Sequence, residues 1–141
     1  MFERYTENAR RAIYFARYEA SVRGTAQITA EQLLLSILRK DKTVASRLGW
    51  DTLNAIRKEL DQPGPPGERT PTSVDLPISL QMQSALELAV EEADALGSKS
   101  IDTPHLILGL LRVQDSLAAQ LLRKHGLAYA EYRELSGRRD G

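Results

Sequence analysis

The sequence predicts an all-α fold, an eight-helix bundle made of two pseudo-symmetric four-helix repeats. Apolar residues recur at helical spacing through most of the 141 residues, and no stretch alternates like a β-strand over a useful length. The helical pattern also occurs twice at a fixed offset of 73 positions. The clearest match places IDTPHLILGLLR at 101–112 over ITAEQLLLSILR at 28–39.

The repeat extends well beyond this match. When residues 6–48 are placed over residues 79–121, 12 of the 43 pairs are identical. Many other pairs exchange one apolar residue for another, which is typical of a duplicated structural unit. We therefore predict one compact domain with repeat 1 at 1–60, a Pro/Gly-rich linker at 61–77, repeat 2 at 78–136 and a flexible tail at 137–141.

The first two helices of each repeat have recognisable start and stop signals. Thr6 is suited to cap the first helix, small alanines follow at helical spacing, and Gly24 favours termination. The second helix carries an apolar stripe that has to pack against the first helix, since it is too apolar to face water. Its start signals are Thr29 with Gln32 in repeat 1, and Asp102 with Thr103 and Pro104 in repeat 2.

A short third segment and a fourth helix complete each repeat. The third segments contain Val44, Ala45 and Leu48, or Leu117, Ala118, Leu121 and Leu122. The fourth helices contain Leu53, Ile56 and Leu60, or Tyr129, Tyr132 and Leu135. The copies differ at the join, because Gly49 and Gly126 lie 77 positions apart.

Composition excludes several classes of function. Basic and acidic residues balance at 19 each, so no overall field attracts nucleic acid or an anionic membrane. Cysteine is absent, which excludes disulfides and thiolate chemistry. The amino terminus lacks the apolar core of a signal peptide, and no run approaches a membrane span. We expect a cytoplasmic protein, a monomer in isolation, with no cofactor, metal, nucleic-acid or membrane partner.

Several motifs together resemble one known family. FERYTENARRAIYFARYEA, the two matched helix sequences, VASRL and LAAQLL are similar to the Clp N-terminal domain, a double Clp repeat that precedes the ATPase modules of ClpA- and ClpC-type unfoldases. The resemblance implies an eight-helix, non-catalytic domain that binds adaptor proteins and unfolded or marked substrates for a Clp ATPase on the same or another chain. The sequence contains no G-x-x-x-x-G-K-[ST] phosphate-binding loop.

The resemblance also suggests one site residue. In ClpC-type relatives, a glutamate at the start of the second helix of each repeat helps to recognise phosphorylated arginine. Glu31 matches this position in repeat 1, whereas Pro104 stands in repeat 2 and offers no carboxylate. A single site near Glu31 and Thr6 is therefore implied. The alternative is that Glu31 is simply a first-turn acid favoured by the helix dipole.

Aromatic residues suggest a second candidate site. Tyr14 and Tyr18 are one helical turn apart, on a different side from the alanine row of the first helix. They are candidates for an exposed apolar patch that receives a peptide or an adaptor. The alternative is that both rings pack against the linker or the other repeat.

Other polar residues favour structural roles. His105 and His125 lack the clustered ligands of a metal site, and we expect both at helix ends. Glu91, Glu92 and Asp94 are expected on the mostly exposed face of the fifth helix, so they do not indicate a catalytic acid/base pair. Two other functions remain open: an all-α interaction protein unrelated to proteolysis, or a small enzyme with a pocket that the sequence does not reveal.

Overall fold

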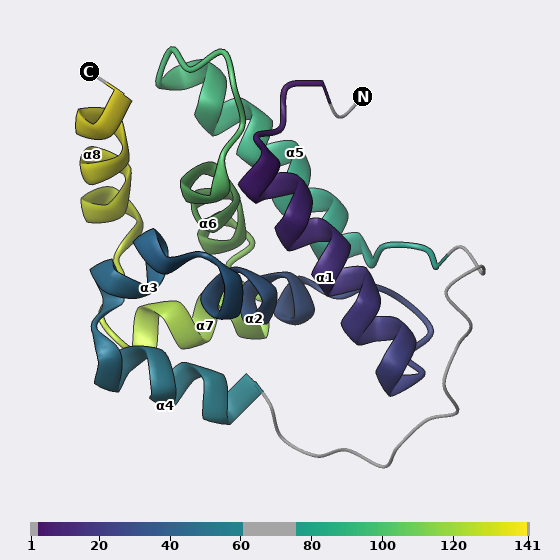
Figure 1. Cartoon of the computed structure of the whole chain (residues 1–141). Helices are drawn as coiled ribbons and strands as arrows, with labels where there is room; N and C mark the ends of the chain where they lie inside the picture. Colours follow the sequence, from purple (N-terminus) through teal and green to yellow (C-terminus); the bar gives the residue numbers. More distant parts are fainter. Residues whose placement is uncertain (1–2, 61–75, 141) are drawn as a thin grey trace.

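The computed structural model describes residues 3–60 and 76–140, which form eight helices arranged as two four-helix repeats (Figure 1). Extended pairing in these ranges is limited to two isolated bridges, so the all-α prediction is confirmed. Residues 61–75, most of the predicted linker, lie outside the described residues. The helices are α1 (Glu7–Arg23), α2 (Ala30–Lys40), α3 (Lys42–Leu48), α4 (Trp50–Leu60), α5 (Leu80–Ala95), α6 (Thr103–Arg112), α7 (Leu117–Lys124) and α8 (Tyr129–Asp140).

The helices of repeat 1 start at the residues that the sequence indicates. Thr6 caps α1, its hydroxyl oxygen accepting the backbone N–H of Ala9 at 3.1 Å. The helix ends where Gly24 turns left-handed with φ of 67°, a conformation that glycine adopts without strain. Thr29 and Gln32 cap α2 reciprocally, each side chain accepting the other residue's backbone N–H.

The start of α6 uses a histidine in the same way. Asp102 is the N-cap, and its backbone N–H donates to Nδ1 of His105 at 2.9 Å. His105 is buried and therefore serves the helix start, as expected. The predicted helix-end position of His125 is also confirmed, because this residue caps the carboxyl end of α7.

The core forms where each first helix packs closely on its second helix. Both α2 and α6 are buried along nearly their whole length, and α1 and α5 meet them with rows of alanine. In repeat 1, Ser36 Oγ donates to the carbonyl oxygen of Ala12 at 2.6 Å. At the equivalent position in repeat 2, a Cβ added to Gly109 would lie 2.2 Å from the carbonyl oxygen of Ala85. The small residues are therefore what permits the short distance between these helices.

The two repeats interlock through the segments that precede α1 and α5. Tyr5 pairs with Ile101, and Ile78 pairs with Ile28, each as an isolated parallel bridge. The paired residues are equivalent in the two copies, so each repeat lies beside the start of the other repeat's second helix. Pro77, assigned to the linker from sequence, belongs to this interlock, because its carbonyl oxygen accepts the N–H of Ile28 at 2.9 Å.

A charged contact joins the repeats at the far end of the molecule. Glu59 on α4 accepts from Lys124 Nζ at 2.7 Å and lies 3.1 Å from Nε2 of His125. Hydrogen bonds from Lys124 and His125 lower the pKa of the Glu59 carboxyl below its ordinary value. The contact fixes the end of α7 against α4.

Repeat 2 ends in a helix that is longer than predicted. The sequence suggested a flexible tail at 137–141, but α8 continues to Asp140 and packs against α6. A single glycine weakens a helix by only about 1 kcal/mol, and Gly137 is followed by residues that all carry backbone N–H groups. Gly137 therefore does not end the helix.

Candidate functional site

A groove runs along α1, and α5 forms the opposite wall of one of its two parts. One part of it has a volume of about 540 Å³ and is lined by Glu3, Arg10, Ile13 and Tyr14. The adjoining part, of about 470 Å³, is lined by Tyr5, Ile13, Ile78, Gln83, Leu86, Glu87 and Val90. Because Ile13 borders both parts, we treat them as one feature and name it the α1/α5 groove.

The floor of the α1/α5 groove follows the internal symmetry of the chain. Tyr5 and Ile78 are equivalent in the two repeats, and so are Ile13 and Leu86. Ile13 and Leu86 pack against the core but remain partly exposed, because they flank the buried alanine rows of α1 and α5. An apolar surface open to solvent thus forms where the two repeats meet.

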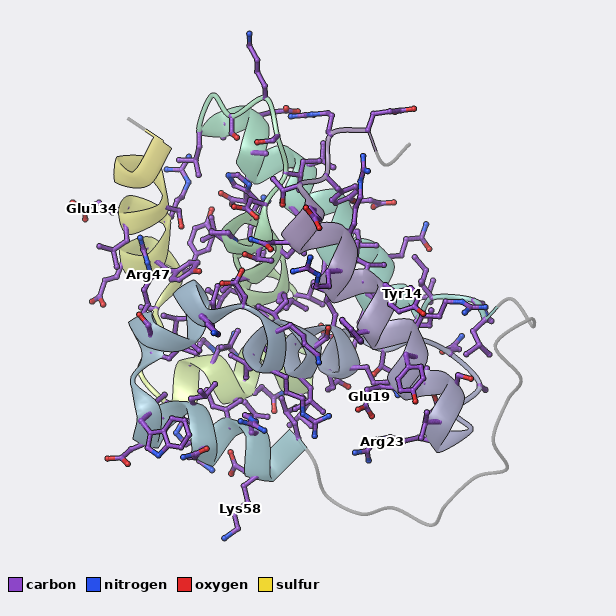
Figure 2. All side chains as sticks on the ribbon, viewed as in Figure 1. Tyr14, Glu19, Arg23, Arg47, Lys58 and Glu134 are labelled. Atoms are coloured by element: carbon purple, nitrogen blue, oxygen red, sulfur yellow. The ribbon has the colours of Figure 1, made fainter. Side chains whose placement is uncertain are left out.

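An exposed apolar ridge continues from the groove along α1. Tyr14, labelled in Figure 2, is 62% exposed, Tyr18 is 43% exposed and Val22 is 39% exposed. Tyr14 borders the groove, while Tyr18 and Val22 follow at successive helical turns. The Tyr14 ring also meets Phe15 edge-on, with 5.5 Å between centroids. The structure therefore exposes both predicted tyrosines and brings one of them into the groove.

The other two candidate residues, Thr6 and Glu31, lie at the starts of different helices. The Thr6 hydroxyl donates to Oδ1 of Asp102 at 2.7 Å, so it lies beside the start of α6. Glu31 lies in the first turn of α2, and no hydrogen bond joins it to Thr6. The reason is the crossed interlock, which places the residues before α1 against repeat 2. No hydrogen bond joins the two side chains, and a site near both stays a prediction.

Glu31 itself has an unusual environment. Its side chain is half-buried, and Oε2 is buried with no hydrogen-bond partner among the described residues. Burial raises the pKa of the Glu31 carboxyl above its ordinary value, with a smaller opposing contribution from its own backbone N–H. In repeat 2 the equivalent position is closed, because Pro104 is buried between Thr103 and His105.

Glu92 is a buried carboxylate, contrary to the prediction from sequence. We expected it on an exposed face, but it is 2% exposed. It contacts Arg112 at 3.4 Å, Arg133 at 3.3 Å and the hydroxyl of Tyr129, so it joins α5 to α6 and α8. Burial and the Glu92 carboxylate both raise the pKa of the Tyr129 hydroxyl. The neighbouring Glu91 stays exposed, as expected.

The repeat pattern contained a signal for this cluster. Glu19 and Glu92 are an identical pair, as are Arg39 and Arg112, and each glutamate contacts the arginine of its own repeat. In repeat 1, Glu19 meets Arg39 at 2.7 Å and Arg23 at 3.0 Å; Glu19 and Arg23 are labelled in Figure 2. Because the glutamate and the arginine are each identical in the two repeats, the sequence indicated that both repeats contain the same ion pair.

Some kinds of site are not seen in the part of the chain that the structure describes. Residues 3–60 and 76–140 contain no group of three or more acidic or histidine side chains placed to hold a metal ion. None of the helices in the same ranges has both the length and the apolar character needed to cross a bilayer.

Comparison with protein families identifies the fold. A family model described as the Clp repeat (R) N-terminal domain matches residues 4–134. The chain belongs to this family. Clp N-terminal domains are non-catalytic interaction domains, and the two repeats of the present chain have the arrangement expected of such a domain.

Individual relatives agree with this assignment. The chain is 33% identical to a ClpA homolog, an ATP-dependent Clp protease ATP-binding subunit of Guillardia theta, over 94% of the chain and 16% of that protein. It is 34% identical to the chloroplastic chaperone protein ClpC1 of Oryza sativa subsp. japonica, over 89% of the chain and 14% of that protein. The Clp repeat domain described here thus spans about one sixth of these relatives, and its expected cytoplasmic location stays a prediction.

A solved structure supports the fold directly. The crystal structure of the N-terminal domain of the chaperone ClpD from Arabidopsis thaliana superposes with a TM-score of 0.73 at 28% identity, covering 100% of this chain and 97% of that one. The predicted Clp repeat architecture is confirmed.

Proposed function

We propose that this Clp repeat domain binds segments of unfolded substrates or of adaptor proteins in the α1/α5 groove. The bound protein is then delivered to a Clp ATPase on the same or another chain. Family membership supports a binding module, and one observation supports the groove as its binding site. This observation is Tyr14, an aromatic side chain left 62% exposed beside the apolar floor of the groove.

The physical basis is burial of apolar surface on binding. A tyrosine ring presents a large rigid area with few rotatable bonds, so it loses little entropy when a partner covers it. Ile13 and Leu86 offer further apolar surface that is only partly covered in the free domain. An apolar side chain of an unfolded segment would remove both surfaces from water, and an unfolded segment exposes more such side chains next to one another than a folded surface does.

The groove residues support binding rather than catalysis. Both histidines of the chain are used at helix ends, where His105 accepts a backbone N–H and His125 contacts Glu59. The buried carboxylate of Glu92 already binds two arginines and a tyrosine hydroxyl. The groove itself therefore lacks a histidine to act as a general base.

A second binding position is proposed at Glu31. Its carboxyl group is half-buried, and Oε2 lacks a hydrogen-bond partner among the described residues but is enclosed, so a guanidinium group of a marked substrate would pair with it after the covering side chains move. The closed environment of Pro104 argues against an equivalent position in repeat 2. Phosphorylated arginine is the ligand to test, with unmodified arginine as the comparison.

Affinity capture from the native cell extract tests the main proposal. The baits are the wild-type domain, a Tyr14→Ala/Tyr18→Ala variant and a Trp50→Ala control. Trp50 is 71% exposed and borders a separate hollow between α3 and α4. It is therefore an exposed aromatic residue like the tyrosines, but it lies on a different surface. We expect the wild type and the control to retain a Clp ATPase, protease or adaptor, and the tyrosine variant to lose most of it.

Two results would contradict the proposal. A folded wild-type bait that retains no Clp component would remove the assigned function. If the Trp50→Ala control loses as much of the captured Clp component as the tyrosine variant, the binding function stands but the groove is not its location. Circular dichroism of all three baits shows whether each is folded.

A further inference from the structure

The two walls of the α1/α5 groove have diverged although its floor has not. Tyr14 on α1 is equivalent to Glu87 on α5, and the next exposed turn pairs Tyr18 with Glu91. Duplication placed the same apolar pairs on the floor, so the difference is confined to the rims. One rim is aromatic and the other is acidic.

Glu87 is the acidic residue of α5 that has no cationic partner among residues 3–60 and 76–140. Its carboxylate is exposed, borders the groove, and accepts only a long hydrogen bond of 3.5 Å from Gln83 Nε2. The other acids of α5 each lie near an arginine. Asp94 meets Arg4 at 2.8 Å, and both Glu91 and Glu92 lie within 4 Å of Arg112.

The basic residue of the groove does not neutralise Glu87. Arg10 lines the other part of the groove together with Glu3, and no ion pair joins it to Glu87. Among the described residues that line the part bordered by α5, the charged one is therefore Glu87, which is negative. A carboxylate at the edge of an apolar surface attracts a cation more strongly than one in open water, because the surface excludes part of the solvent.

We propose that the groove selects segments that carry a lysine or arginine next to a large apolar side chain. The apolar side chain covers Ile13 and Leu86, and the cation pairs with Glu87 as a charge-assisted hydrogen bond. The aromatic rim at Tyr14 covers the opposite edge of the segment. This inference rests on the proposed binding function and adds the class of segment and the residue that recognises it.

Two labelled peptides that differ at one position test the inference by fluorescence anisotropy. Both carry a central phenylalanine, followed by lysine in one peptide and by glutamate in the other. We expect the lysine peptide to bind the wild type about tenfold more tightly, since an attraction replaces a repulsion. Glu87→Gln should weaken the lysine peptide about threefold to fivefold, and Glu87→Lys should reverse the preference.

Glu91→Gln is the matched control, because Glu91 is an exposed acid one turn further along α5 that does not line the groove. It should leave the binding of both peptides nearly unchanged. A loss equal to that of Glu87→Gln would indicate a general field of the helix and overturn the assignment to Glu87. Equal affinity of the wild type for both peptides would overturn charge selection.

The outcomes also separate this inference from the proposed function. If both peptides bind equally and Tyr14→Ala weakens both, the groove binds peptides without selecting charge, so only the further inference fails. If neither peptide binds a folded domain and the capture experiment retains no Clp component, the proposed function fails as well. Circular dichroism shows whether each Glu87 variant is folded, and because Glu87 is exposed we expect its substitutions to change stability only slightly.

Discussion

Glu19 and Glu92 occupy equivalent positions in the two repeats but differ in what they hold together. Glu19 remains partly exposed and contacts arginines of α1 and α2. Glu92 is buried and reaches Tyr129 and Arg133 on α8 in addition to Arg112 on α6. In each repeat the equivalent ion pair joins the first helix to the second. In repeat 2 the carboxylate of Glu92 also attaches α8.

The helix starts show a contrast in the same direction. Repeat 1 leaves Glu31 half-buried with an oxygen lacking a hydrogen-bond partner among the described residues, while repeat 2 closes the position with Pro104. Thus repeat 2 is the more tightly closed copy at both places. Duplication preserved the apolar core, where a change of size is costly, and allowed the edges to diverge.

The close contact between the first and second helices gives the largest expected difference between the repeats. Gly109→Ala places a Cβ against the Ala85 carbonyl, where only movement of the backbone can make room, so we expect a loss of about 3 kcal/mol in the free energy of unfolding. Ser36→Ala in repeat 1 removes one hydrogen bond and should cost about 1 kcal/mol. Urea unfolding followed by circular dichroism measures both. Similar losses for the two variants would show that the repeats pack alike.

The buried carboxylate gives the next effect. Glu92→Gln leaves Arg112 and Arg133 without their shared charge, and both arginines are partly exposed, so we expect a loss of about 2 kcal/mol rather than the full value for a buried pair. Glu19→Gln should cost less than about 1 kcal/mol, because water reaches that site. Hydrogen exchange should show the Glu92 variant opening first in α8. Faster exchange in α2 instead would contradict the role of Glu92 in attaching α8.

Local signals made most of the fold predictable from sequence. Capping residues such as Thr6 and Thr29 act within one helical turn, so their effect does not depend on the rest of the chain. The alanine rows and the apolar stripes occur in both repeats, so each copy supported the helix predicted in the other. The burial of Glu92 could also have been predicted, because Glu92 follows the buried Ala89 by three positions and therefore lies on the same helical face.

Features that depend on contacts far apart in the sequence could not be predicted in this way. The Tyr5 to Ile101 bridge crosses the two repeats, and nothing in either segment alone specifies its partner. That crossing also places Thr6 beside Asp102 of the other repeat. The α1/α5 groove depends on how the first helices of two repeats lie relative to each other, so Tyr14 was found as a candidate while Glu87 was not.

Glu31 gives the smallest expected effect and the one that depends on pH. Below its ordinary pKa the carboxyl is protonated in both the folded and the unfolded chain, so it does not affect stability. As pH rises, the unfolded chain releases the proton first, because burial raises the folded-state pKa, and stability falls until the folded-state pKa is passed. Near neutral pH, Glu31→Gln should therefore stabilise the domain by up to about 1 kcal/mol.

The exposed first-turn acid of α1 provides the matched control for this prediction. Glu7 pairs with Arg11 at 2.8 Å and gains from the helix dipole, so Glu7→Gln should slightly destabilise the domain under the same conditions. Urea unfolding at neutral pH and at a pH below the ordinary pKa of a glutamate carboxyl compares the two variants, and the gain from Glu31→Gln should disappear at the lower pH. A loss of stability on Glu31→Gln near neutral pH would mean that the carboxylate is favourably bound in the folded domain. In that case the difference between the two helix starts would be one of shape alone, and the proposed attraction of Glu31 for a guanidinium group would lose its physical basis.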